Sequence, residues 1–69
     1  MKKIAVIYHL SKDKSFHYEV GGHIFYNDRN LKIKDIMVTN EKVLKLEFEE
    51  GGFVCFYGIP FKYFEVPIN

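Results

Sequence analysis

The sequence predicts an all-β domain, a small antiparallel sheet or barrel-like meander of five or six strands. A single short helical turn, which would make the class α+β, is the alternative. Apolar and polar residues alternate with a period of two in several segments, and clusters of turn-forming residues separate those segments. No segment shows a sustained period of 3.6. A chain of 69 residues, 48% of them hydrophobic and 28% charged, has room for one packed domain.

The N-terminal part predicts three strands. Residues 4–10 have one fully apolar face and one partly apolar face, as in the central strand of a sheet. Residues 16–20 and 23–27 also alternate, and the Gly-Gly pair at 21–22 suits a two-residue hairpin turn that would pair these two segments with each other. The run Asn-Asp-Arg-Asn at 27–30 predicts the next turn, because Asn and Asp side chains bond their own backbone.

Residues 31–39 predict a long strand. The apolar positions shift out of phase at 35–38, which admits a β-bulge there. A polar turn is expected at 40–42, before the next apolar run.

Residues 43–49 give the clearest strand pattern of the chain, with Leu, Leu and Phe alternating with Lys, Glu and Glu. A three-residue loop at 50–52 with Gly in the left-handed conformation would join this strand to residues 53–57 and place Phe48 opposite Val54. The second strand is apolar on both faces. Such a strand is either covered on both sides or exposes a patch to a partner.

The tail at residues 58–69 has a proline near its start, Pro60, which stops a sheet ladder. We expect a short turn, a single helical turn or an edge strand here. No apolar run is long enough to span a bilayer, and no small-residue cleavage site follows the N-terminal apolar stretch. Together with the single cysteine, this predicts a cytoplasmic protein.

Candidate catalytic and metal-binding residues are few, and we predict no enzyme activity, no cofactor and no metal site. The expected hairpin places His17 and His23 on opposite faces, which is unsuitable for a shared metal ion. Cys55 lies between apolar residues in a strand, where burial would keep a thiol unreactive. No nucleophile elbow and no phosphate-binding glycine loop is present.

A sequence pattern between residues 36 and 64 resembles the KTSC domain, a small module found alone and appended to lysyl-tRNA synthetases. The shared features are a strand, a glycine hairpin, an aromatic strand and a proline turn followed by an aromatic residue. The positions that carry this resemblance are Leu44, Leu46, Phe48, Gly51, Val54, Phe56, Ile59, Pro60 and Phe64. The resemblance implies a nucleic-acid-associated role.

The charge distribution agrees with nucleic-acid binding as one candidate function. Residues 1–34 carry seven basic and three acidic side chains, whereas residues 35–69 carry three basic and six acidic ones. Lysines that neutralise phosphate and exposed aromatic rings that stack on bases are what such binding requires. The candidate residues are Arg29, Lys32 and Lys34.

The density of aromatic residues favours protein-protein interaction as the leading function. Seven Phe and five Tyr are more than a domain of this size can bury, and many lie in the last third of the chain. The predicted interface residues are Phe53, Tyr57, Phe61, Tyr63 and Phe64. We expect a homodimer and an unidentified protein target. The high lysine usage indicates an AT-rich genome, so we expect a small protein from a low-GC bacterium or its phage, or from a mobile element, that binds and inhibits a host factor.

Overall fold

The computed structural model describes residues 1–67, which form seven strands and one turn of 3-10 helix. The predicted all-β class is confirmed. The elements are β1 (Lys2–His9), η1 (Leu10–Lys12), β2 (Lys14–Glu19), β3 (His23–Tyr26), β4 (Arg29–Val38), β5 (Leu44–Phe48), β6 (Phe53–Phe56) and β7 (Phe61–Val66).

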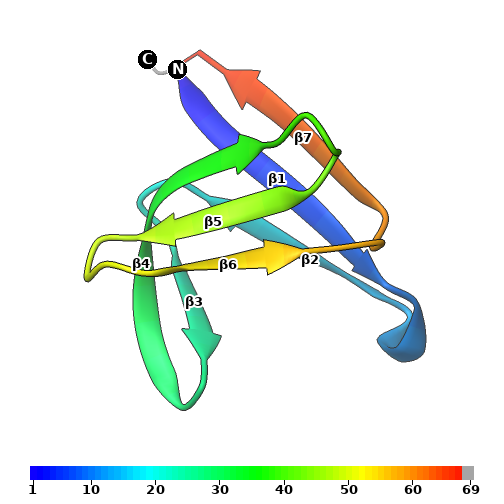
Figure 1. Cartoon of the computed structure of the whole chain (residues 1–69), viewed down its shortest axis with the longest axis horizontal. Coiled ribbons are helices and arrows are strands. Elements are labelled where there is room, and N and C mark those ends of the chain that lie inside the picture. Colours follow the sequence, from blue (N-terminus) through cyan, green and yellow to red (C-terminus); the bar gives the residue numbers. More distant parts are fainter. Residues whose placement is uncertain (68–69) are drawn as a thin grey trace.

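The strands form two antiparallel sheets that enclose the core (Figure 1). One sheet has the order β2-β1-β7 and the other the order β3-β4-β5-β6. The second sheet curls, and β4, its longest strand, bends around the core (Figure 1). The N-terminus lies beside the end of β7, because Lys2 is paired with Val66.

The first sheet confirms that residues 4–10 supply a central strand, since β1 pairs with both β2 and β7. The face that turns to the core is the one the sequence shows as partly apolar, with Ala5 and Ile7 fully buried. Ile4 and Val6 point to the other side of the sheet, where cross-strand neighbours cover Ile4.

The hairpin predicted at the Gly-Gly pair is wrong. The chain leaves the first sheet there, and β3 pairs with β4 through a turn at Asn27-Asp28, both of which have positive φ, as a type I′ turn requires. Gly21 donates its N–H to the carbonyl of Ile33 at 2.9 Å, and the N–H of Ile33 donates to the carbonyl of Gly22 at 2.8 Å. The glycine pair is therefore a corner that joins the two sheets.

The β4-β5-β6 meander follows the predicted order. The bulge is confirmed as a register shift between Ile33 and Asp35. Leu44, Leu46 and Phe48 of β5 are buried, as their alternation predicts.

The predicted β5-β6 register is wrong by two residues, because Val54 lies opposite Leu46 and not opposite Phe48. The loop begins one residue earlier than predicted: the N–H of Phe48 donates to the carbonyl of Gly52. Gly51 takes the left-handed position, with φ +94°. A shift of two residues leaves every side chain on its predicted face.

The tail takes the edge-strand form among the alternatives that the sequence left open. β7 follows Pro60, whose carbonyl accepts the N–H of Tyr8 at 3.0 Å, and the strand then pairs with β1 along its length. Phe61 and Tyr63 pack against the core, while Phe64 lies on the outer face beside Ile4.

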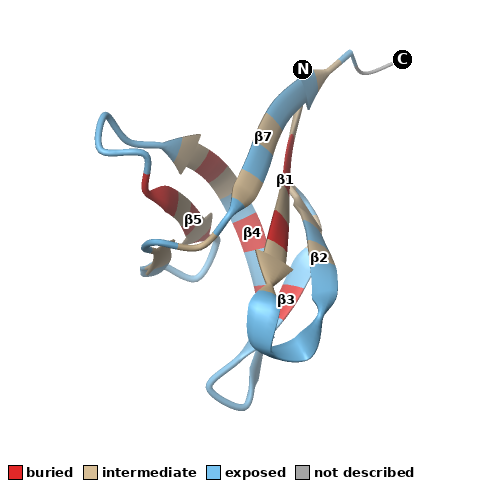
Figure 2. Cartoon of the chain, turned by 90° about the vertical axis from the view of Figure 1, so that its right-hand side faces the viewer, coloured by how far each residue is buried: buried red, intermediate tan, exposed pale blue. Residues whose placement is uncertain are grey.

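The core lies between the two sheets, and the buried residues of β1, β4 and β5 face it (Figure 2). Its main members are Ala5, Ile7, Ile24, Leu31, Ile33, Ile36, Leu44, Leu46 and Phe48. Among residues 1–67, no helix is long and apolar enough to cross a membrane.

Candidate interaction surface

A hollow of about 210 Å³ opens between the tips of the β3-β4 and β5-β6 hairpins, and we call it the hairpin hollow. The two tips are neighbours because β5 runs antiparallel to β4, so that the end of β5 lies beside the start of β4. The lining residues are Tyr26, Asn27, Arg29, Leu31, Phe48, Glu50, Gly51, Gly52 and Phe53.

The hairpin hollow has an apolar floor and aromatic walls. Leu31 and Phe48 lie beneath it and belong to the core. Tyr26 and Phe53 also line it, with 41% and 61% of their surface exposed. A hollow lined by exposed aromatic residues and buried apolar ones is a site in which an apolar group can leave water.

An ion pair crosses the rim of the hairpin hollow. Nη2 of Arg29, on β4, lies 2.8 Å from Oε2 of Glu50, in the β5-β6 loop. Both side chains are largely exposed, so the pair contributes little to stability. Its role is geometric, because it connects the two hairpin tips. On the outer side of β5, the Lys45 ammonium lies 4.5 Å from the centre of the Phe53 ring and orients that ring.

The five residues of the predicted protein interface do not share one surface. Phe53 and Tyr57 lie on the outward side of β6 and just beyond its end, with Tyr57 70% exposed. Phe64 is on the outer face of the other sheet and is 41% exposed. Phe61 and Tyr63 are half-buried against the core, because the tail forms a strand whose odd positions face inward.

The predicted nucleic-acid residues divide in a similar way. Arg29 is held by Glu50 at the hairpin hollow, whereas Lys32 and Lys34 are exposed on the outward face of β4. On the adjacent strand β3, Phe25 is 71% exposed on that same outward face, opposite Asn30. The sequence did not single out Phe25 or Tyr26, because the expected hairpin with residues 16–20 removed β3 from its true partner.

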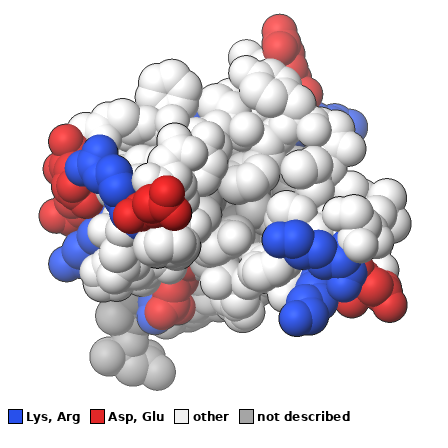
Figure 3. All heavy atoms as spheres, turned by 90° about the horizontal axis from the view of Figure 1, so that it is seen from below, with Lys and Arg blue, Asp and Glu red and all other residues white. Residues whose placement is uncertain are grey.

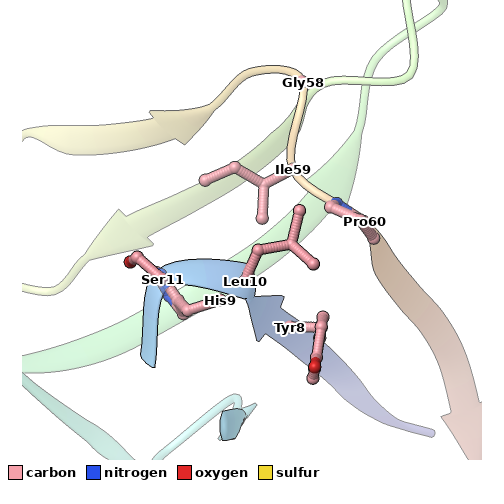
Figure 4. Close-up of a pocket in the computed structure, with 7 residues that line it drawn as sticks. All are labelled: Tyr8, His9, Leu10, Ser11, Gly58, Ile59 and Pro60. Carbon is pink, nitrogen blue, oxygen red and sulfur yellow. The ribbon is translucent and has the colours of Figure 1, made fainter. Parts of the chain in front are cut away.

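Two further hollows line the surface. One, of about 310 Å³, lies between the β4-β5 turn and β6 and includes Cys55 and Tyr57. The other lies between η1 and the segment before β7, where the side chains of Leu10 and Ile59 point toward one another (Figure 4). Beside it, the His9 ring packs edge-on against Phe16.

The titratable residues near the η1 hollow are engaged within the chain. The hydroxyl of Tyr8 donates a hydrogen bond to the Asp13 carboxylate, and this bond raises the pKa of Tyr8 above its usual value. Within residues 1–67, no three His, Cys, Asp or Glu side chains are grouped as metal ligands would be. The face seen in Figure 3 carries charged residues in separate groups, with a wide uncharged area between them.

Comparisons with known proteins give no match to a family model, a curated protein or a solved structure. The resemblance to the KTSC domain therefore stays a prediction. The geometry of the surface alone bears on what this chain binds.

Proposed function

We propose that this chain is a non-catalytic protein-protein interaction module that holds an apolar side chain of its target in the hairpin hollow. The observation that carries the proposal is that the exposed Phe53 and Tyr26 line the same hollow as the buried Leu31 and Phe48. Aromatic residues and arginine dominate the binding energy of protein interfaces, and Arg29 stands on the rim.

The total surface supports an interaction role. The chain exposes 5060 Å², against the roughly 4500 Å² that the size scaling of compact monomers gives for its mass. Large apolar side chains that no part of the described chain covers contribute to this surface, including Phe25, Phe53 and Tyr57. A partner protein that covers some of them would remove apolar area from water, which favours association.

The composition of the sequence supports a proposal for the class and the setting of the module. We propose a small phage or mobile-element protein that binds and inhibits a host factor, and the free thiol of Cys55 fits a reducing compartment such as the cytoplasm. Self-association into a homodimer would use a different surface, the edge of β7.

The test is capture of proteins from lysate of the source cell by three forms of the chain: wild type, Phe53→Asp and Phe25→Asp. Each sample is divided into nuclease-treated and untreated halves. Phe53 lines the hairpin hollow, whereas Phe25 does not line it and is 71% exposed, against 61% for Phe53, so the second variant is the matched control. We expect a protein that survives nuclease, binds wild type and Phe25→Asp, and is lost with Phe53→Asp.

A photo-crosslinking residue at position 53 then tests contact directly. It should form a covalent adduct with the captured protein, and the same residue at position 25 should not. Capture that is unaffected by Phe53→Asp would overturn the proposal. Circular dichroism of each variant shows that the fold is intact, as expected for residues this exposed.

A second candidate function is nucleic-acid binding on the outward face of the β3-β4 hairpin. The observation that favours it is the exposed Phe25 ring on the same face as Lys32 and Lys34. A ring for base stacking beside two cations is the arrangement that single-stranded nucleic acids require. Binding of a fluorescent oligonucleotide should fall steeply with salt, weaken in the double variant Lys32→Glu and Lys34→Glu, and tolerate Phe53→Asp. Salt-independent binding would exclude this function.

A further inference from the structure

The outer edge of β7 presents backbone hydrogen-bonding groups that no strand of the described chain satisfies. β7 is the last strand of the order β2-β1-β7, so only one of its sides is paired. Pairs in an antiparallel ladder alternate between exchanging both hydrogen bonds and exchanging none. Because the N–H of Tyr8 donates to Pro60, the bonded pairs of this ladder include Val6 with Lys62 and Ile4 with Phe64.

It follows that Phe61, Tyr63 and Glu65 direct their N–H and C=O groups away from β1. The pairing of β1 with β2 is consistent with this alternation, because the odd residues of β1 direct their backbone groups toward β2. The carbonyl of Lys3, for example, accepts the N–H of Val20 at 3.2 Å. We call this set of outward groups the β7 edge. It extends over a regular strand of six residues without proline or bulge.

The other three strand edges are less suited to pairing. β3 and β6 are only four residues long. β2 has six residues, but the carbonyl of Glu19 at its end already accepts the N–H of Gly22, and the Glu19 carboxylate is bound to Lys2. Short and charged edges resist pairing with other chains, and a longer regular edge invites it.

We infer that two copies of this chain associate by antiparallel pairing of β7 with β7, with Phe64 of one copy opposite Phe64 of the other. The two three-stranded sheets would then form one continuous sheet of six strands. Only registers that pair odd residues with odd residues engage the β7 edge. The interface is small, so the association is weak, with a Kd in the micromolar range.

Charge and shape select this register from its neighbours. A shift by two residues toward Lys62 separates the two Phe64 rings and places Phe61, which has no hydroxyl to bond a carboxylate, opposite Glu65. A further shift places Lys62 opposite Lys62. A shift the other way places Glu65 opposite Glu65. The register centred on Phe64 joins the two exposed rings in a close, non-bonded pair, sets Lys62 against Val66 and sets Tyr63 against Glu65.

The experiment measures molar mass by sedimentation equilibrium from low micromolar to near millimolar concentration, for wild type, Glu65→Pro and Glu65→Ala. The N–H of Glu65 points away from β1, so proline there leaves the β1-β7 ladder intact and blocks only the β7 edge. We expect a dimer for wild type and Glu65→Ala, and a Kd raised at least about tenfold for Glu65→Pro. A monomeric wild type, or equal weakening by both substitutions, would overturn the inference.

Symmetric cysteine crosslinking tests the register and does not depend on how proline is tolerated. In a Cys55→Ser background, Phe64→Cys should form a disulfide-linked dimer under mild oxidation, because opposite non-bonded positions lie about 4.5 Å apart at Cα. Lys62→Cys is the matched control on the same face, and its thiols would lie about 13 Å apart along the strands. Crosslinking at position 62 that equals or exceeds that at position 64 contradicts the register. The Phe53→Asp variant should dimerise as wild type does, which separates this inference from the proposed function.

Discussion

The chain contains two Gly-Gly pairs, and the structure uses them differently. Gly51-Gly52 closes a hairpin between β5 and β6, neighbours in one sheet, and both residues have positive φ. Gly21-Gly22 links β2 to β3, which belong to different sheets, and only Gly21 has positive φ. The same dipeptide therefore specifies a turn in the chain without specifying which strands the turn brings together.

The difference comes from what flanks each pair. The segment after Gly52 has no other turn signal before β6 ends, so β6 pairs with the strand just before it. The segment after Gly22 is four residues long and runs directly into Asn27-Asp28, whose positive φ values suit a tight hairpin with β4. β3 pairs with β4, and the glycine corner bonds to Ile33 of β4, next to the first pair of that ladder.

The largest loss of stability is expected from Ile33→Ala, which removes a side chain beside the Gly21-Gly22 corner. Ile33 is fully buried, and its backbone bonds to both glycines of the corner. Truncation leaves a cavity between the sheets and should lower the free energy of unfolding by about 2 to 5 kcal/mol, measured by urea denaturation. Val38→Ala on the same strand removes an exposed side chain and should cost less than about 1 kcal/mol. Equal losses of unfolding free energy for the two variants would mean that burial of Ile33 in the core does not stabilise the corner.

Single alanine substitutions at Gly21, Gly22 and Gly52 should distinguish two causes of lost stability: backbone strain at positive φ and steric crowding of the added Cβ. Gly21 and Gly52 have φ of +89° and +85° with open space around the site of a Cβ, so L-alanine should cost about 1 to 2 kcal/mol at each. A Cβ at Gly22, whose φ is not positive, would lie 3.1 Å from the carbonyl oxygen of Glu19.

D-alanine, introduced by chemical synthesis, provides the control. D-residues favour positive φ, so D-alanine at Gly21 or Gly52 should restore stability to at least that of the wild type in thermal unfolding. D-alanine at Gly22 should not. If it rescued all three positions alike, the corner would have the backbone of an ordinary hairpin.

How far the sequence predicts the fold depends on whether a feature is local. The alternation in β5, the bulge after Ile33 and the central position of β1 could be predicted, because each depends on the residue pattern of its own segment. The partner of β3 and the β5-β6 register could not, because the first is decided by competition between turns and the second by a shift of one residue in where the loop begins.

The candidate site shows the same limit. Phe53 and Arg29 were identified from the sequence, but as members of two different surfaces, and the structure brings them to one hollow. Tyr26 completes its wall only because β3 pairs with β4. A site formed by two hairpin tips depends on strand pairing, so its residues cannot be grouped before the pairing is known.

The smallest effect on stability is expected from an ion pair, which connects the two sheets at a second place besides the Gly21-Gly22 corner. The Gly51-Gly52 turn joins two strands of one sheet and makes no such connection. The ammonium of Lys3 on β1 lies 2.9 Å from Oδ1 of Asp35, at the bulge of β4, and the same oxygen accepts the N–H of Ile36. The hydrogen bond from Lys3 holds the pKa of Asp35 below its usual 3.8, against the opposing effect of burial, and raises the pKa of Lys3 above 10.5. Asp35→Asn removes the charge and leaves an oxygen for Ile36.

The stability that this ion pair contributes has a defined pH window. Because the pKa of Asp35 is lowered in the folded chain, the contribution of the ion pair is complete above pH 3.8 and is lost as the pH falls through the folded pKa of Asp35. Because the pKa of Lys3 is raised in the folded chain, the contribution is also lost as the pH rises beyond 10.5. Both side chains are a third exposed, so the difference between wild type and Asp35→Asn at neutral pH should be below about 1 kcal/mol and should shrink with salt. Urea denaturation across the acidic range measures it. A difference that persists unchanged well below pH 3 would show that Asp35 holds the sheets together through the shape of the bulge and not through its charge.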